Sequence, residues 1–150
     1  MGRFLAFQFA IDLNYSDAME ASEDEFVVAG PGACDGIAKC LGATARGIES
    51  EVIRYMADTQ ESHFARLGLD FPGLFGRRLQ LIDCQNLFCE VDKYARVAHP
   101  SVRGISGRSR IKQKFRPLAE PLSAFFPPKW RLTKSFSGST RGDPQLALFG

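Results

Sequence analysis

LQLIDCQNLFCEVDKYAR, residues 79–96, is the stretch that decides the fold. It contains neither proline nor glycine and its apolar residues recur at helical spacing, so it predicts a helix that runs to about Val97 and stops before His99-Pro100. At about 100° per residue, four of its polar residues fall within one narrow arc that has apolar neighbours on both sides. This polar stripe consists of Asp83, Asn86, Glu90 and Lys93. A solvated helix face is usually broad and polar throughout, so the stripe indicates either a functional surface or an internal polar network.

The rest of residues 1–100 also predicts helices. Apolar residues at helical spacing indicate helices over residues 4–13, 33–41 and 48–67, and glycine or proline separates them. There is no internal repeat and no convincing strand alternation. The sequence therefore predicts an all-α fold.

A turn with the sequence Gly30-Pro31-Gly32 precedes the helix at 33–41. Ser22 and Glu25 have the spacing of a capping box, which predicts a short helical turn that ends near Gly30. Two helical segments joined by such a turn resemble a helix-hairpin-helix element, whose backbone N–H groups can bind a phosphate. The alternative is that these residues form only a turn.

Composition limits the classes of protein to consider. The chain has 150 residues, enough for one domain with a hydrophobic core. No apolar run is long enough to span a bilayer and no secretory signal is recognisable, so we expect a cytoplasmic protein with no membrane partner. The four cysteines match neither common zinc spacings nor redox pairs, which predicts reduced, half-buried thiols.

Charge is divided unevenly along the chain. Residues 1–100 hold 9 Lys or Arg and 15 Asp or Glu, a net charge of −6, whereas residues 101–150 hold 10 and 2, a net charge of +8. A basic arm can bind a polyanion, although it can also fold back onto an acidic body. We therefore expect a helical domain at 1–100, a basic, proline-containing arm packed on it at 101–134, and a flexible tail at 135–150.

Three segments together resemble one family: GPGACDGIAKCLG at 30–42, GRRLQLIDCQNLFCEVDKYAR at 76–96 and RSRIKQKF at 108–115. They resemble the alpha-glutamyl/putrescinyl thymine pyrophosphorylases, amino acid:DNA transferases of DNA base hypermodification. They are also similar to the helical domain of hydroxymethyluracil DNA kinases. The resemblance covers roughly residues 3–116 and implies a helical fold similar to DNA glycosylases, with DNA as a partner and a hydroxymethyluracil DNA kinase as a further one. The chain looks shorter than intact transferases, which fits an N-terminally truncated member with a misplaced start, a split subunit or a remnant.

The chemistry that the resemblance implies is transfer of an amine onto a hydroxymethyl pyrimidine activated as a phosphate or pyrophosphate ester in DNA. Glu90 or Asp83 could take the proton from the amine, Lys93 could face the leaving phosphate, and Asn86 could read the base edge. Asp83 and Glu90 could also hold a divalent metal ion; no other cofactor is indicated. Further candidates for the pocket are Gln8, Asp12, Arg77 and Arg78. Candidates for DNA binding are Gly30, Gly32, Lys39, Arg108, Arg110, Lys112 and Lys114.

Two other interpretations stay open. The stripe could be a structural network in which Lys93 pairs with Glu90 and both are tied to Arg77 or Arg78. The chain would then be a DNA-binding module without chemistry, or an inactive fragment. It lacks the phosphate-loop motif GxxxxGK[ST], so by itself it is not a kinase.

The C-terminal residues QLALF resemble the peptide that binds bacterial sliding clamps. Leu146, Leu148 and Phe149 would enter an apolar groove while Gln145 forms hydrogen bonds at its rim. The alternative is that this short apolar segment docks on its own domain.

Overall fold

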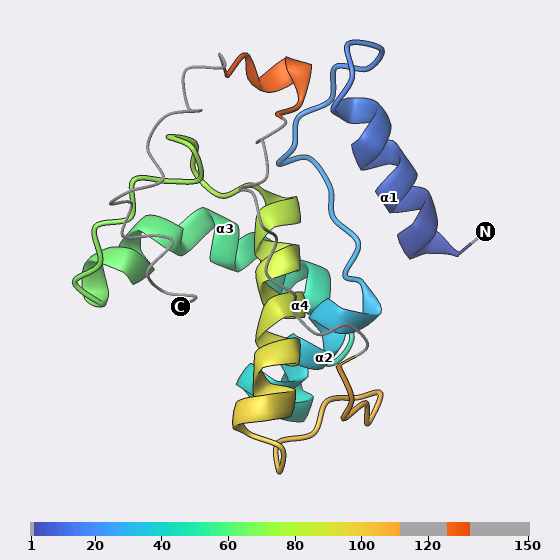
Figure 1. Cartoon of the computed structure of the whole chain (residues 1–150), viewed down its shortest axis with the longest axis vertical. Helices are drawn as coiled ribbons and strands as arrows, with labels where there is room; N and C mark the ends of the chain where they lie inside the picture. Colours follow the sequence, from blue (N-terminus) through green and yellow to red (C-terminus); the bar gives the residue numbers. More distant parts are fainter. Residues whose placement is uncertain (1, 112–125, 133–150) are drawn as a thin grey trace, which may run out of the picture.

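A computed structural model of the chain describes residues 2–111 and 126–132. Its helices are α1 (Arg3–Asn14), α2 (Pro31–Leu41), α3 (Glu49–Arg66) and α4 (Leu81–Ala98), with short 3₁₀ turns at η1 (Gly42–Ala45) and η2 (Pro128–Trp130) (Figure 1). Over these residues the only β-type pairing is one isolated bridge between Leu74 and Arg77. The all-α prediction is confirmed, and the α-helices begin and end within two residues of the expected positions.

The tightest contact in the fold is between α2 and α4. A Cβ atom on Gly36 would lie 2.0 Å from the main-chain oxygen of Phe88, so only glycine permits this approach. Ile37, Ile53 and Leu81 are almost fully buried where α2, α3 and α4 meet. The decisive stretch thus forms the central helix, against which both α2 and α3 pack.

Helix α1 is attached to this core by one face only. Phe7 and Ile11 belong to the hydrophobic core, whereas Leu5, Phe9 and Leu13 are 51%, 53% and 57% exposed. In Figure 1, α1 lies alongside the extended chain that leads into α2. Its strongly apolar sequence does not make it a helix buried on all sides.

The segment between α1 and α2 has no helix, so the short helical turn predicted between Ser22 and Gly30 is wrong. The reason lies in where its backbone groups bond. The carbonyls of Asp24 and Glu25 accept hydrogen bonds from the Arg54 guanidinium at 3.0 and 3.1 Å, so α3 satisfies groups that a helix would have used internally. The helix-hairpin-helix interpretation is therefore not confirmed: Pro31 opens α2 directly after extended chain.

The four cysteines, Cys34, Cys40, Cys84 and Cys89, are all free thiols. Cys84 is buried, and this burial raises the pKa of its thiol to about 11. None of the helices in residues 2–111 and 126–132 is long and apolar enough to cross a membrane.

Candidate functional site

The C-terminal half of α4 carries a buried carboxylate that the helical arc did not single out. Asp92 is 1% exposed and accepts hydrogen bonds from Arg96 one turn further along α4. Lys39 of α2 approaches the same carboxylate at 2.9 Å, and its side chain is only 3% exposed. Lys39, which we expected to contact DNA, therefore has its ammonium group inside the fold.

A second buried carboxylate, Asp35 of α2, binds the segment that follows α4. Its oxygens accept hydrogen bonds from the backbone N–H and hydroxyl of Ser106, and the Arg108 guanidinium lies 2.8 Å away. Burial raises the pKa of Asp35, but the bonds from Ser106 and Arg108 outweigh it, so the pKa lies below its ordinary value of 3.8. The predicted DNA-binding residue Arg108 is thus part of an internal ion pair, although 40% of its side chain is exposed.

The polar stripe does not converge on one site. Asp83 forms a capping box at the start of α4, where its carboxylate accepts the backbone N–H of Gln80 at 2.9 Å. Asn86 is exposed, and its side-chain oxygen accepts a hydrogen bond from Gln85. Glu90 and Lys93 pair with each other at the surface, 63% and 51% exposed. Asp83 and Lys93 lie about 15 Å apart along the helix axis, so only Asp83 lies near the groups described next.

Around the N-terminal end of α4, charged and aromatic side chains lie together. Glu23, buried in the segment after α1, accepts hydrogen bonds from the Trp130 indole N–H at 2.9 Å and from Arg77 at 3.1 Å. The Arg77 guanidinium also lies 4.1 Å from the centroid of the Trp130 ring, a cation–π contact. The other carboxylate oxygen of Glu23 is buried and has no hydrogen-bond partner among the described residues.

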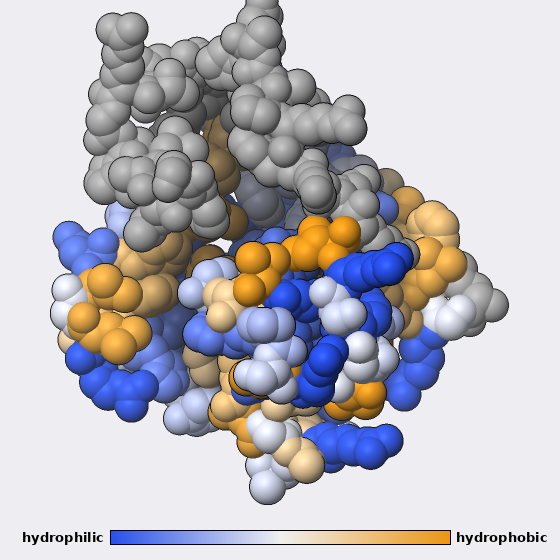
Figure 2. Space-filling model, turned by 60° about the horizontal axis from the view of Figure 1, so that its bottom comes forward, coloured by the Kyte–Doolittle hydropathy of each residue, from blue (hydrophilic) through white to orange (hydrophobic). Residues whose placement is uncertain are grey.

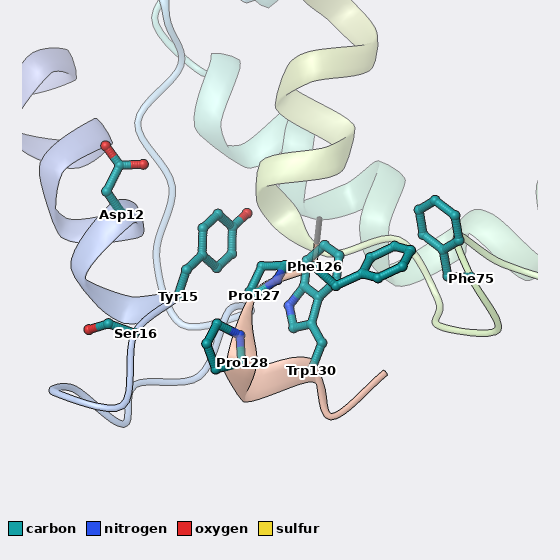
Figure 3. Close-up of a pocket in the computed structure, with 8 residues that line it drawn as sticks. All are labelled: Asp12, Tyr15, Ser16, Phe75, Phe126, Pro127, Pro128 and Trp130. Atoms are coloured by element: carbon teal, nitrogen blue, oxygen red, sulfur yellow. The ribbon is translucent and has the colours of Figure 1, made fainter. Parts of the chain in front are cut away.

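A pocket of about 700 Å³ opens beside this cluster (Figure 3). Its walls come from three parts of the chain: the end of α1, the turn at 74–77 and the segment at 126–130. They are formed by Asp12, Tyr15, Ser16, Phe75, Phe126, Pro127, Pro128 and Trp130. We call this the aromatic pocket. Of the four residues predicted to join a pocket, Asp12 lines it and Arg77 stacks on its wall.

The remaining two predicted pocket residues lie apart from its lining. Arg78 donates hydrogen bonds to the Ala57 carbonyl and the Glu61 carboxylate of α3 and to the Asp24 carboxylate. Gln8 is on α1, with its amide nitrogen buried and without a partner in the described part of the chain.

Burial and neighbouring acidic groups act together on Tyr15 of the aromatic pocket and on nearby Asp83. Burial, together with the nearby charges of Glu23 and Asp83, raises the pKa of Tyr15 to about 12, so its hydroxyl keeps its proton at neutral pH. Burial likewise raises the pKa of Asp83, although the Gln80 N–H bond and Arg77 act in the opposite direction. Asp83 is thus a carboxyl group more easily protonated than an exposed one.

Residues 1–104 match the family described as "5-hmdU DNA kinase, helical domain". The chain belongs to this family. No curated protein and no solved structure gave a significant match. The membership relates the chain to proteins of DNA base modification. It confirms the predicted similarity to the helical domain of hydroxymethyluracil DNA kinases, while the relation to the amino acid:DNA transferases stays a prediction.

The family match covers only part of the aromatic pocket. Asp12, Tyr15 and Phe75 lie within residues 1–104, whereas Phe126 and Trp130 lie beyond them. The pocket therefore combines the helical domain of the family with a part of this chain that the family does not cover.

Of the residues predicted to bind DNA or a sliding clamp, several lie inside the fold or outside the described residues. Gly30 and Gly32 face inward: a Cβ atom on Gly30 would meet the Phe4 ring at 2.6 Å, and one on Gly32 would meet the Cys89 sulfur at 3.0 Å. Lys112, Lys114 and the clamp-binding residues Gln145, Leu146, Leu148 and Phe149 lie outside the described residues. In the described part of the chain, no group of three or more His, Cys, Asp or Glu side chains could hold a metal ion.

Sequence reasoning missed Tyr15, Glu23 and Trp130. One signal was available for Trp130, because it is the single tryptophan of the chain and follows the rigid dipeptide Pro127-Pro128 within the basic arm. Glu23 gave none, since it lies in an acidic run, SEDE, that reads as solvated.

Proposed function

We propose that the chain is a DNA-binding helical domain that acts in the modification of 5-hydroxymethyl pyrimidines in DNA, alongside a hydroxymethyluracil DNA kinase. The observation that carries this proposal is the family match over residues 1–104. The absence of a phosphate-loop motif from the sequence assigns phosphoryl transfer to a separate protein or domain.

The distribution of charge supports a DNA-binding surface at the C-terminal end of α4. Lys39 has an internal partner, but Arg103 and Arg110 are exposed there, and the Arg110 carbonyl is held by Arg96 at 2.8 Å. Figure 2 brings this end forward and shows strongly hydrophilic residues next to hydrophobic ones. Val102 and Ile105 are 42% and 48% exposed in the same segment. Exposed arginines beside apolar groups suit contact with a phosphate backbone and its sugars.

The experiment is a salt titration of binding to a fluorescent duplex that carries one 5-hydroxymethyluracil. Each lost phosphate contact should reduce the slope of log affinity against log salt by about 0.9. For the double variant Arg103→Ala with Arg110→Ala, we expect the magnitude of the slope to fall by about 2, because two phosphate contacts are lost. The hydrogen bond from Arg96 to the main-chain carbonyl of residue 110 is retained, so the local structure should not change. Arg66→Ala, an exposed arginine at the end of α3, is the matched control. Equal slopes for the double variant and the wild type would contradict this surface, and no binding at low salt would contradict the function.

A catalytic form of this function is the transfer of an amine onto the activated hydroxymethyl group. Two features favour it: Asp83 is partly buried at the start of α4, where burial raises its pKa, and its charge contributes to the raised pKa of Tyr15 in the aromatic pocket. A carboxyl group of this kind can accept the proton of an attacking amine. Glu90 is the weaker candidate, because it is 63% exposed and paired with Lys93.

Mass spectrometry of nucleosides tests amine transfer. The protein would be incubated with DNA that contains phosphorylated or pyrophosphorylated hydroxymethyluracil, together with amino acids and polyamines. We expect an amine adduct that disappears in Asp83→Asn, which retains an oxygen to accept the Gln80 N–H, and persists in the control Glu90→Gln. If the wild-type protein binds DNA but forms no adduct, amine transfer is contradicted and only the DNA-binding function remains.

A further inference from the structure

Four of the eight residues that line the aromatic pocket are aromatic, which suits contact with a flat ring. Tyr15 and Trp130 meet edge to face with their ring centroids 5.7 Å apart, and Phe75 and Phe126 do so at 4.6 Å. Figure 3 shows Asp12 and Tyr15 coming from α1, with the rings of Trp130 and Phe126 between Tyr15 and Phe75. The pocket volume of about 700 Å³ is within the range of about 300–1,000 Å³ typical of small-molecule sites.

Trp130 is held in a fixed orientation before any ligand arrives. Its indole N–H donates to Glu23 and the Arg77 guanidinium covers one face of its ring. A ligand ring that stacks on Trp130 would have to use the face opposite Arg77. Because the indole is already ordered, stacking on it costs little side-chain entropy.

Phe75 is kept at the pocket by an unfavourable backbone conformation. Its φ is +54°, in the left-handed region that bulky residues avoid, and Gly76 follows at φ +76°. Two backbone hydrogen bonds between Leu74 and Arg77, at 2.7 and 3.1 Å, close the tight turn that imposes this conformation. A phenylalanine at such a position costs on the order of 1–3 kcal/mol, and strain of this size concentrates at ligand-binding sites.

Asp12 supplies the polar group that would orient a bound ring. It lies one helical turn before Tyr15 on α1 and lines the same pocket. An ionised carboxylate only accepts hydrogen bonds, so it selects a ring that offers an N–H. A uracil-type base has one ring N–H between two carbonyl groups, and it also offers a flat face for stacking.

We propose that the aromatic pocket receives a single uracil-type base turned out of DNA. The base stacks on Trp130 from the side opposite Arg77, in the pocket that Tyr15 and Phe75 also line, and donates its ring N–H to Asp12. This inference rests on the proposed DNA-binding function and names the substrate group that the domain would hold. A base outside the duplex is accessible to chemistry at its 5-hydroxymethyl group, whereas a stacked one is not.

The single tryptophan provides a direct measurement. The full chain would be titrated with 5-hydroxymethyl-2′-deoxyuridine, with an oligonucleotide containing that base, and with the same oligonucleotide carrying an abasic site. We expect saturable quenching of Trp130 fluorescence by the first two and none by the third. Binding of each oligonucleotide would be followed in parallel by anisotropy.

Variants then separate the pocket from general DNA affinity. Trp130→Ala should weaken binding of the base-containing oligonucleotide about 5- to 150-fold, the range for loss of one base–aromatic stack, and leave the abasic one unchanged. Asp12→Ala should show the same selectivity with a smaller loss and does not disturb the Trp130 segment. Asp17→Ala, which removes an exposed negative charge just after α1, is its matched control.

The outcomes distinguish this inference from the proposed function. Salt-dependent DNA binding without quenching, and with Asp12→Ala equal to Asp17→Ala, would overturn the base pocket and keep the DNA-binding function. Quenching by the nucleoside without any DNA binding would overturn both the proposed function and the origin of the base in DNA. Quenching by the nucleoside and by the base-containing oligonucleotide but not by the abasic one, with a loss of affinity in Asp12→Ala that anisotropy detects for the base-containing oligonucleotide only, would support the proposal.

Discussion

Charged side chains gather at both ends of α4, and the two ends differ in how completely these charges are satisfied. At the C-terminal end, Asp92 has two cationic partners and almost no exposed surface. Around the N-terminal end, one oxygen of Glu23 is buried without a partner in the described chain, and the pKa of Asp83 is raised by burial. A site that is fully paired can stabilise the fold but has little left for a ligand. The buried charges at the C-terminal end therefore hold the scaffold together, and only exposed arginines such as Arg103 and Arg110 are left there for the proposed phosphate contacts. Capacity to hold a ligand in a pocket lies at the N-terminal end.

Removing Asp92 should have the largest effect on stability. In Asp92→Ala, Lys39 and Arg96 would be left buried without their counter-charge, which typically costs about 3–5 kcal/mol. The free energy of unfolding from urea denaturation measures this. A loss of less than about 1 kcal/mol would show that the end we describe as satisfied is open to water.

Substitution of Gly36 should have the next largest effect on the free energy of unfolding. In Gly36→Ala, the new methyl group would overlap the Phe88 carbonyl, so α2 and α4 must separate, at a cost of about 1–3 kcal/mol. Gly2→Ala, where the added atom meets nothing within 4 Å, is the control for a glycine substitution. Equal midpoints in urea for the two variants would mean that the scaffold is looser than described.

The stability contributions of Asp35, which binds the segment after the C-terminal end of α4, and of Asp83, at the N-terminal end, should depend on pH with opposite signs. The folded-state pKa of Asp35 is lowered, so the stability it contributes is present above its ordinary value of 3.8 and is lost as pH falls through the folded value. The pKa of Asp83 is raised, so the folded state holds its proton more tightly and the contribution of Asp83 improves as pH falls.

Stability measured against pH in the wild type, Asp35→Asn and Asp83→Asn tests both signs. Asp35→Asn should lose about 1–3 kcal/mol at neutral pH, a deficit that shrinks below pH 3.8. Asp83→Asn should remove a fall in stability as pH rises above 3.8. If the free energy of unfolding depends on pH in the same way in both variants, the proposed electrostatic difference between the two ends of α4 is contradicted.

The smallest effect is expected for Glu90. It is 63% exposed, and its pair with Lys93 lies at the surface, so Glu90→Ala should change the free energy of unfolding by less than about 0.5 kcal/mol. A loss of 2 kcal/mol or more in urea denaturation would mean that the stripe is the internal network we considered from sequence.

Helix positions followed from the sequence because periodicity, glycine and proline act locally. The sequence did not predict which face of α4 is buried. Angular spacing identifies residues that share a face, but it does not say which face meets another helix. Asp92 lies outside the stripe and is nevertheless the buried carboxylate, because Lys39 reaches it from 53 residues away in the chain. The aromatic pocket was unpredictable for the same reason, since Tyr15, Phe75 and Trp130 come from three distant segments.

The hydrogen bonds from Ser106 and Arg108 to Asp35 determine how far this domain can be truncated and still fold with full stability. The family match ends at Gly104, two residues before the first of these bonds. A chain shortened to residue 104 would bury Asp35 without its cation and without the N–H of Ser106. The cooperative folding unit should therefore extend past the family boundary, and a protein ending at residue 104 should melt at a lower temperature than one that retains residues 105–111.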